Sequence, residues 1–139
     1  HLALGETDDW AHEGRYDRVL EALRGADEAL RRIWEFVETD PSYAGKTCIV
    51  VTTDHGRGRG PEAWRHHGPG IAGTEDVWMA LVSPESSRRG EWIDEAPLEL
   101  GQTAPTIAAW LGVPRGDSLL APIDEVVGSG ATPRTMASR

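Results

Sequence analysis

The chain has 139 residues, enough for one domain of ordinary size, and its hydrophobic fraction of 39% excludes a disordered polypeptide. Its formal net charge of -9 argues against non-specific nucleic-acid binding, because such proteins need a basic face to neutralise phosphates. No run approaches the ~20 apolar residues of a membrane-spanning helix, and the single cysteine, Cys48, cannot form an internal disulfide. The chain begins with His1, so we expect a fragment or processed chain; compartment and oligomeric state stay open.

The first half of the chain predicts one long amphipathic helix. Residues 1–5 are a short apolar segment that could form the end of a strand, and residues 6–14 are polar. Residues 16–38 have apolar side chains spaced alternately four and three apart, which is the period of an α-helix. These side chains are Val19, Leu23, Ala26, Leu30, Ile33 and Val37. Trp34 and Phe36 widen this apolar stripe, which favours packing of the helix on a sheet.

The second half predicts two strands and a short helix. Residues 46–53 and 77–82 read as buried strands, and the consecutive β-branched residues of the first suggest burial on both faces. A long loop rich in Gly, Arg and His joins them. Residues 103–111 predict a short helix ended by Gly112.

The alternation of helices and apolar strands predicts an α/β fold, part of a mainly parallel sheet flanked by helices. Two or three strands are too few to close such a core, so we expect partner strands in a missing N-terminal portion. Residues 118–127 form a short apolar segment, and residues 128–139 are expected to be a disordered tail.

Acidic and imidazole side chains occur together at spacings that suit a metal ion. Asp8 and His12 are four apart, so in a helical turn both point to one face. Asp54 and His55 directly follow the first predicted strand, and ligand sites in open α/β sheets lie at the carboxyl ends of strands. His66 and His67 lie further along the same loop, far enough away for that stretch to fold back over the site.

Each of these residues also has a simpler interpretation. The acids at 8 and 9 could serve a helix N-terminus, and a single surface histidine is more often solvated than a ligand. Asp9 is an alternative to Asp8, and His66 is a rival for His67. The association of acids with histidines at ligand spacing favours the metal-site interpretation.

Three segments resemble the second half of the alkaline phosphatase superfamily, a group that includes nucleotide phosphodiesterases, phosphonate hydrolases, phosphoglycerate mutases and sulfatases. They are residues 8–14 (DDWAHEG), 52–56 (TTDHG) and 64–68 (WRHHG). The similarity continues through residues 76–84 and 102–112 and covers about residues 1–127. Gln102 stands where the family usually has an aspartate.

The resemblance implies a metal-dependent hydrolase of phosphate monoesters or diesters with two divalent ions, zinc being expected and manganese or calcium being alternatives. By that resemblance Asp8, His12 and His67 bind one ion, and Asp54 and His55 bind the other. The catalytic Ser or Thr nucleophile and a further aspartate are expected upstream, outside this chain. The fragment alone is therefore expected to be inactive, and the substrate of the parent enzyme is expected to be a small phosphate or sulfate ester.

Two alternatives stay open. A sulfatase or a phosphoglycerate mutase-like enzyme of the same superfamily would keep a similar pattern. A non-catalytic metal-binding or interaction module would instead use the apolar stripe of residues 16–38 to pair with a partner helix.

Overall fold

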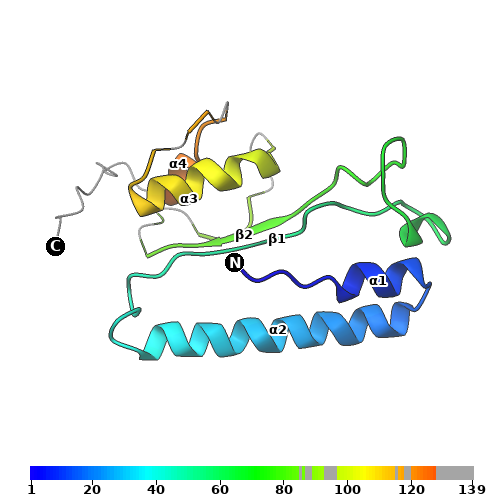
Figure 1. Ribbon diagram of the computed structural model, residues 1–139, viewed down its shortest axis with the longest axis horizontal. Coiled ribbons are helices and arrows are strands. Elements are labelled where there is room, and N and C mark those ends of the chain that lie inside the picture. The colour runs from blue at the N-terminus through cyan, green and yellow to red at the C-terminus, as the bar shows by residue number, and fades with distance from the viewer. Residues whose placement is uncertain (85, 87–88, 93–96, 115, 118–119, 128–139) are drawn as a thin grey trace. The chain divides into compact units, whose positions relative to one another are not determined.

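The computed structural model describes residues 1–84, 86, 89–92, 97–114, 116–117 and 120–127. Its elements follow the chain in the order α1 (Glu6–His12), α2 (Tyr16–Thr39), β1 (Ile49–Thr52), η1 (Ala63–Arg65), β2 (Met79–Val82), η2 (Leu100–Gln102), α3 (Thr103–Leu111) and α4 (Asp124–Val127) (Figure 1). They form two compact units. The first unit comprises His1–Gly45 and Thr53–Trp78, and the second comprises Lys46–Thr52 and Met79–Arg139.

The prediction of a mainly parallel sheet flanked by helices is wrong. Among the described residues the sheet has two strands, β1 and β2, which pair antiparallel with Ile49 opposite Val82 and Thr52 opposite Met79. A parallel pair needs a crossover connection, usually a helix. The segment between β1 and β2 contains only the short η1 helix, and the chain runs back along its own path. The consecutive β-branched residues of β1 are half-buried, whereas the sequence predicted burial on both faces.

The helices follow the sequence pattern closely. The helix predicted over 16–38 is α2, and the helix predicted over 103–111 is α3. The polar segment 6–14 contains α1, whereas residues 1–5 form no strand. No helix in the described part of the chain combines the length and apolar character that crossing a membrane would need. The tail predicted at 128–139 and residues 118–119 lie outside the described residues.

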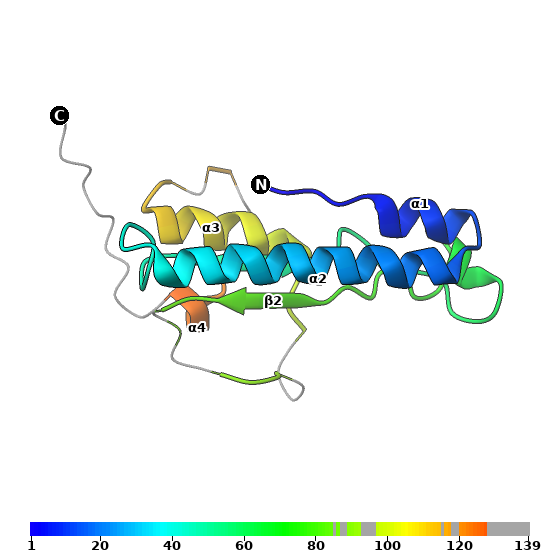
Figure 2. The same ribbon diagram turned by 90° about the horizontal axis from the view of Figure 1, so that it is seen from below.

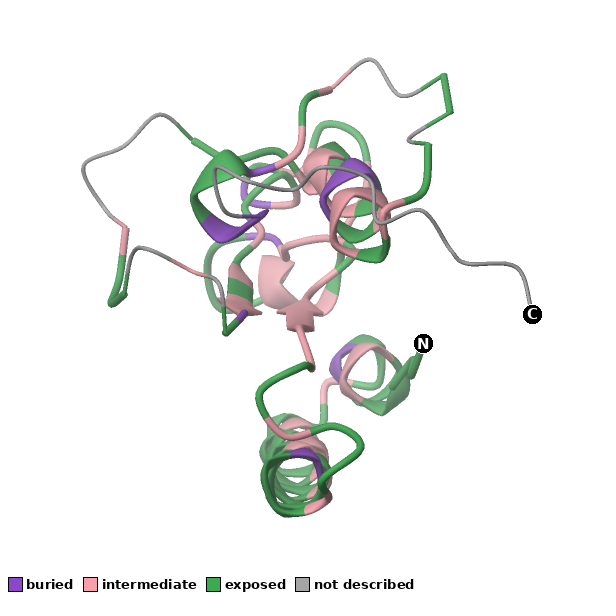
Figure 3. Cartoon of the chain, turned by 90° about the vertical axis from the view of Figure 1, so that its left-hand side faces the viewer, coloured by how far each residue is buried: buried purple, intermediate pink, exposed green. Residues whose placement is uncertain are grey.

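In the first unit, α1 lies alongside the N-terminal part of α2, as both ribbon views show (Figures 1 and 2). The apolar stripe of α2 is covered only in part. Val37 is buried, but Leu23 and Ile33 keep 49% and 41% of their surface exposed. Much of α2 is accordingly exposed (Figure 3). Its stability in this unit therefore depends on helix propensity and side-chain pairs more than on burial.

The second unit has the denser apolar core. Ile123, Val126 and Val127 are buried, and partly buried residues of β2 and α3, together with Trp92, pack against them. The fully buried Thr106 joins α3 to this core: its hydroxyl donates to the Gln102 carbonyl at 2.6 Å and accepts from the Ile123 amide at 3.0 Å. The side chain is thus fully paired, as a buried polar group must be to avoid a large cost.

Candidate metal centre

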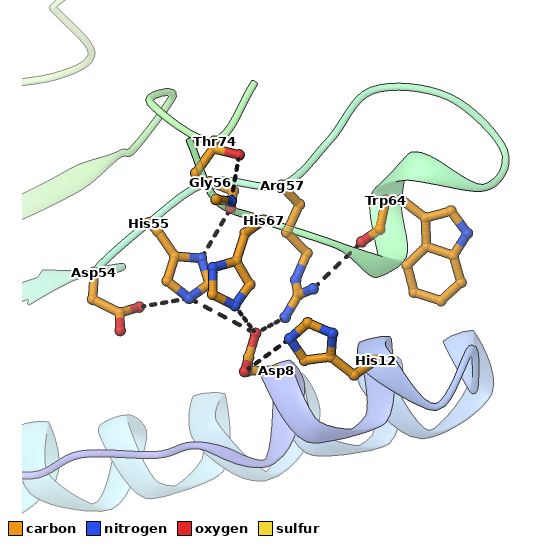
Figure 4. Close-up of polar contacts among 10 residues, drawn as sticks. Asp8, His12, Asp54, His55, Gly56, Arg57, Trp64, His67 and Thr74 are labelled. Atoms are coloured by element: carbon orange, nitrogen blue, oxygen red, sulfur yellow. Dashed lines mark hydrogen bonds and ion pairs between the residues drawn. The ribbon is translucent and has the colours of Figure 1, made fainter. Parts of the chain in front are cut away.

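Asp8 is the centre of a polar cluster in the first unit. Its Oδ1 atom lies 3.7 Å from His55 Nε2 and 3.5 Å from His67 Nε2 (Figure 4). One ligand atom from each of these three residues lies within 4.8 Å of the other two. One carboxylate and two imidazoles from separate parts of the chain therefore converge on a common point. All three side chains are partly exposed, so an ion from solvent has access.

His12 faces the other oxygen of the same carboxylate. As the four-residue spacing predicted, α1 places it on the same face as Asp8, with Nε2 3.5 Å from Asp8 Oδ2. Its ring centroid lies 5.1 Å from that of His67. The structure thus groups the histidines differently from the arrangement that the resemblance implied: His55 and His67 face Asp8 Oδ1, and His12 faces Asp8 Oδ2.

The rings of His55 and His67 stack, with centroids 3.7 Å apart and planes 13° from parallel. The Nδ1 atom of His55 lies 2.9 Å from the Gly56 carbonyl oxygen, which can only accept a hydrogen bond. Nδ1 is therefore the donor in this contact, and the Nε2 atom of the ring faces Asp8. Such a backbone partner orients many metal-ligating histidines in the same way.

Asp54 and His66 lie at the edge of the cluster. Asp54 Oδ1 is 3.7 Å from His55 Nε2, but the Asp54 side chain is 89% exposed. His66 is exposed and its ring centroid is 6.1 Å from that of His12, while Asp9 is exposed on α1. Of the two rivals at 66 and 67, only His67 contributes a ligand atom to the group around Asp8.

Close backbone packing holds the loop that presents His55. The Gly56 amide donates to the Thr74 carbonyl at 2.7 Å, and the Gly58 amide donates to the His66 carbonyl at 3.0 Å. A Cβ atom at Gly56 would lie 2.2 Å from the Gly73 carbonyl oxygen, closer than atoms can approach. A glycine is therefore required at this position for space.

Arg65 connects the same loop to α1. Its Nη2 atom donates to the carbonyl oxygen of His12 at 3.3 Å, near the end of the helix where carbonyl groups lack partners. Gly14 follows with φ of 70°, and a Cβ there would approach the Arg65 guanidinium to 3.0 Å. Because Arg65 is close in sequence to His67, this contact helps bring that histidine to the helix.

Arg57 makes a contact that the sequence did not reveal. Its Nη2 atom donates to Asp8 Oδ1, the same oxygen that faces His55 and His67 (Figure 4). Its Nη1 atom lies 3.5 Å from the Trp64 carbonyl oxygen. The two residues are 49 positions apart, and a pair so distant along the chain leaves no local sequence pattern.

The donor set fits a divalent transition metal. Imidazole nitrogens suit zinc and related ions, whereas calcium prefers oxygen ligands. Metal–ligand bonds of ~2.0–2.2 Å would require the three side chains to close only slightly on an ion. No family model, curated protein or solved structure matches the chain.

Proposed function

We propose that this chain carries the metal-binding part of a metal-dependent hydrolase of phosphate esters. The observation that supports the proposal best is the convergence of Asp8, His55 and His67 on one point. Two imidazoles and one carboxylate are also the protein ligands of several catalytic zinc sites. The sequence resemblance supplies the ester substrate, and the nucleophilic Ser or Thr belongs to a part of the protein outside this chain.

The residues have distinct roles in this proposal. Asp8 Oδ1, His55 Nε2 and His67 Nε2 hold a zinc ion, and His12 holds the second oxygen of Asp8. The Gly56 carbonyl keeps the His55 ring in the tautomer that offers Nε2. When bound, such an ion polarises an ester oxygen and lowers the pKa of a coordinated hydroxyl or water. A second ion, which the sequence resemblance implies, would bind beside Asp54.

The test is metal content together with ester hydrolysis in the full-length protein. Bound zinc is measured for the wild type and for the Asp8→Asn, His55→Ala and His67→Ala variants. Hydrolysis of p-nitrophenyl phosphate, its phosphodiester analogue and the sulfate ester is measured beside it. His66→Ala is the matched control, because His66 adjoins His67 but contributes no ligand atom to the group around Asp8.

We expect zinc binding and phosphate-ester hydrolysis in the wild type and in His66→Ala, and loss of both in the three ligand variants. Hydrolysis confined to the sulfate ester would assign the protein to the sulfatase alternative. Zinc binding without hydrolysis of any ester would favour the non-catalytic metal-binding module. Activity that survives all three substitutions would remove the metal centre from the proposal.

A further inference from the structure

The guanidinium of Arg57 occupies the side of Asp8 on which a metal ion would bind. Asp8 Oδ1 accepts from Arg57 Nη2 and also faces His55 and His67. A divalent ion bound to this oxygen would lie within a few ångströms of the guanidinium. Two cations so close repel each other, and both compete for the same carboxylate oxygen. Binding of an ion at this oxygen therefore favours release of Arg57 from Asp8.

We propose that Arg57 exchanges partners: it neutralises Asp8 while the metal is absent and binds the oxyanion of the substrate when the metal is present. This inference rests on the proposed function and names its substrate-binding residue. A guanidinium matches a phosphoryl group well, because its planar fork donates two parallel hydrogen bonds to two oxygens.

The local structure suits such an exchange. The backbone near Arg57 is fixed, because the neighbouring glycines at 56 and 58 both donate to carbonyls across the loop. The contact of Arg57 Nη1 with the Trp64 carbonyl is long, at 3.5 Å. Release of Asp8 therefore requires movement of the Arg57 side chain and not of the loop backbone.

Arg59 supplies a matched control from the same loop. It pairs with Asp76 and contacts none of the residues around Asp8 in the described structure, and its side chain is 74% exposed against 24% for Arg57. Both positions carry the same charge two residues apart. The Arg57→Gln and Arg59→Gln variants therefore lose the same charge, but only the first loses the contact with Asp8.

The first measurement is zinc affinity of the protein, determined by competition with a chromophoric chelator. Removing a charged hydrogen bond to Asp8 is expected to tighten zinc binding by about tenfold in Arg57→Gln. Arg59→Gln is expected to bind zinc like the wild type. Arg57→Lys keeps the competing charge and is expected to stay close to the wild type.

The second measurement is binding of inorganic phosphate to the zinc-loaded protein by calorimetry. The loss of a bidentate partner is expected to weaken phosphate binding by about tenfold in Arg57→Gln. Arg57→Lys should recover only part of this loss, because an ammonium cannot form the paired hydrogen bonds. Arg59→Gln should again match the wild type. A purely structural role would not move the two affinities in opposite directions.

The proposal requires both changes. Unchanged or weaker zinc binding in Arg57→Gln overturns it, and so does unchanged phosphate binding. In either case zinc binding that still depends on Asp8 would leave the proposed metal centre intact. Absence of zinc binding in both the wild type and Arg57→Gln would overturn the metal centre and the partner exchange together.

Discussion

Each of the two units of this protein is stabilised internally by a different kind of contact. The second unit has a small apolar core around Ile123, Val126 and Val127. The loop of the first unit is instead ordered by backbone hydrogen bonds, close glycine contacts and charged pairs centred on Asp8. Apolar burial is non-directional and tolerates small shifts. Polar contacts need particular geometry, which is what a ligand site requires.

The largest expected effect tests the core of the second unit. Ile123→Ala should destabilise the protein by about 3 kcal/mol, because it removes a fully buried side chain and leaves a cavity. Zinc binding measured at a temperature well below the unfolding midpoint should be unchanged, since Asp8, His55 and His67 belong to the first unit. Urea unfolding and chelator competition measure the two quantities. Loss of zinc binding in the folded variant would show that the site depends on the second unit.

The complementary variant, Gly56→Ala, should act mainly on the site. The added methyl group would meet the Gly73 and Asp76 carbonyl oxygens at 2.2 and 2.4 Å, so the loop backbone must shift at a cost of about 2 kcal/mol. We expect zinc affinity to fall sharply, because a shift of the backbone at position 56 also moves the adjacent ligand His55. The Gly5→Ala variant is the control, as a Cβ at that position meets no atom within 4 Å. Equal zinc affinity in the two variants would contradict the importance of this packing.

The smallest expected effect concerns an exposed charged pair at the start of α2. The hydrogen bond from Arg15 lowers the pKa of Asp17 from its ordinary value of 3.8 to about 2. A lowered pKa in the folded state means that the pair stabilises the protein above pH ~4 and that this contribution disappears as the pH falls through about 2. Both side chains are well exposed, so the contribution should be small.

The measurement is the difference in thermal unfolding midpoint between the wild type and Asp17→Asn across the acid range. The difference should be small above pH ~4 and should vanish as the pH falls below about 2, since Asp17 is then protonated in both states. A difference that persists in strong acid would assign the stabilisation to something other than this pair. Exposed polar contacts of this kind add less than the partly buried ones around Asp8.

The elements with a strong local pattern were predicted well. The alternating spacing from Val19 to Val37 predicted α2 almost to the residue, and α3 ended at Gly112, whose φ of 64° suits a glycine. The spacing of Asp8 and His12 placed both on one face of α1. The sequence also named every histidine of the cluster, because acids and imidazoles at ligand spacing are uncommon.

The direction of the strands and the pairing of side chains could not be predicted in this way. An apolar β-branched run such as Ile49–Thr52 is compatible with parallel or antiparallel neighbours, and only the path of the chain after Thr52 decides between them. Prediction from the apolar stripe of α2 is limited in the same way, since periodicity shows which face of the helix is apolar but not what covers that face.

The sequence by itself determined the helices and the set of candidate metal ligands, because helix period and side-chain chemistry are local properties. The tertiary structure alone decided that His55 and His67 face one oxygen of Asp8, that Arg57 donates to that same oxygen, and that Gly56 has no room for a side chain. Each of these contacts joins segments well separated along the chain. Their geometry is fixed by how the loop folds on itself, which no short stretch of sequence encodes.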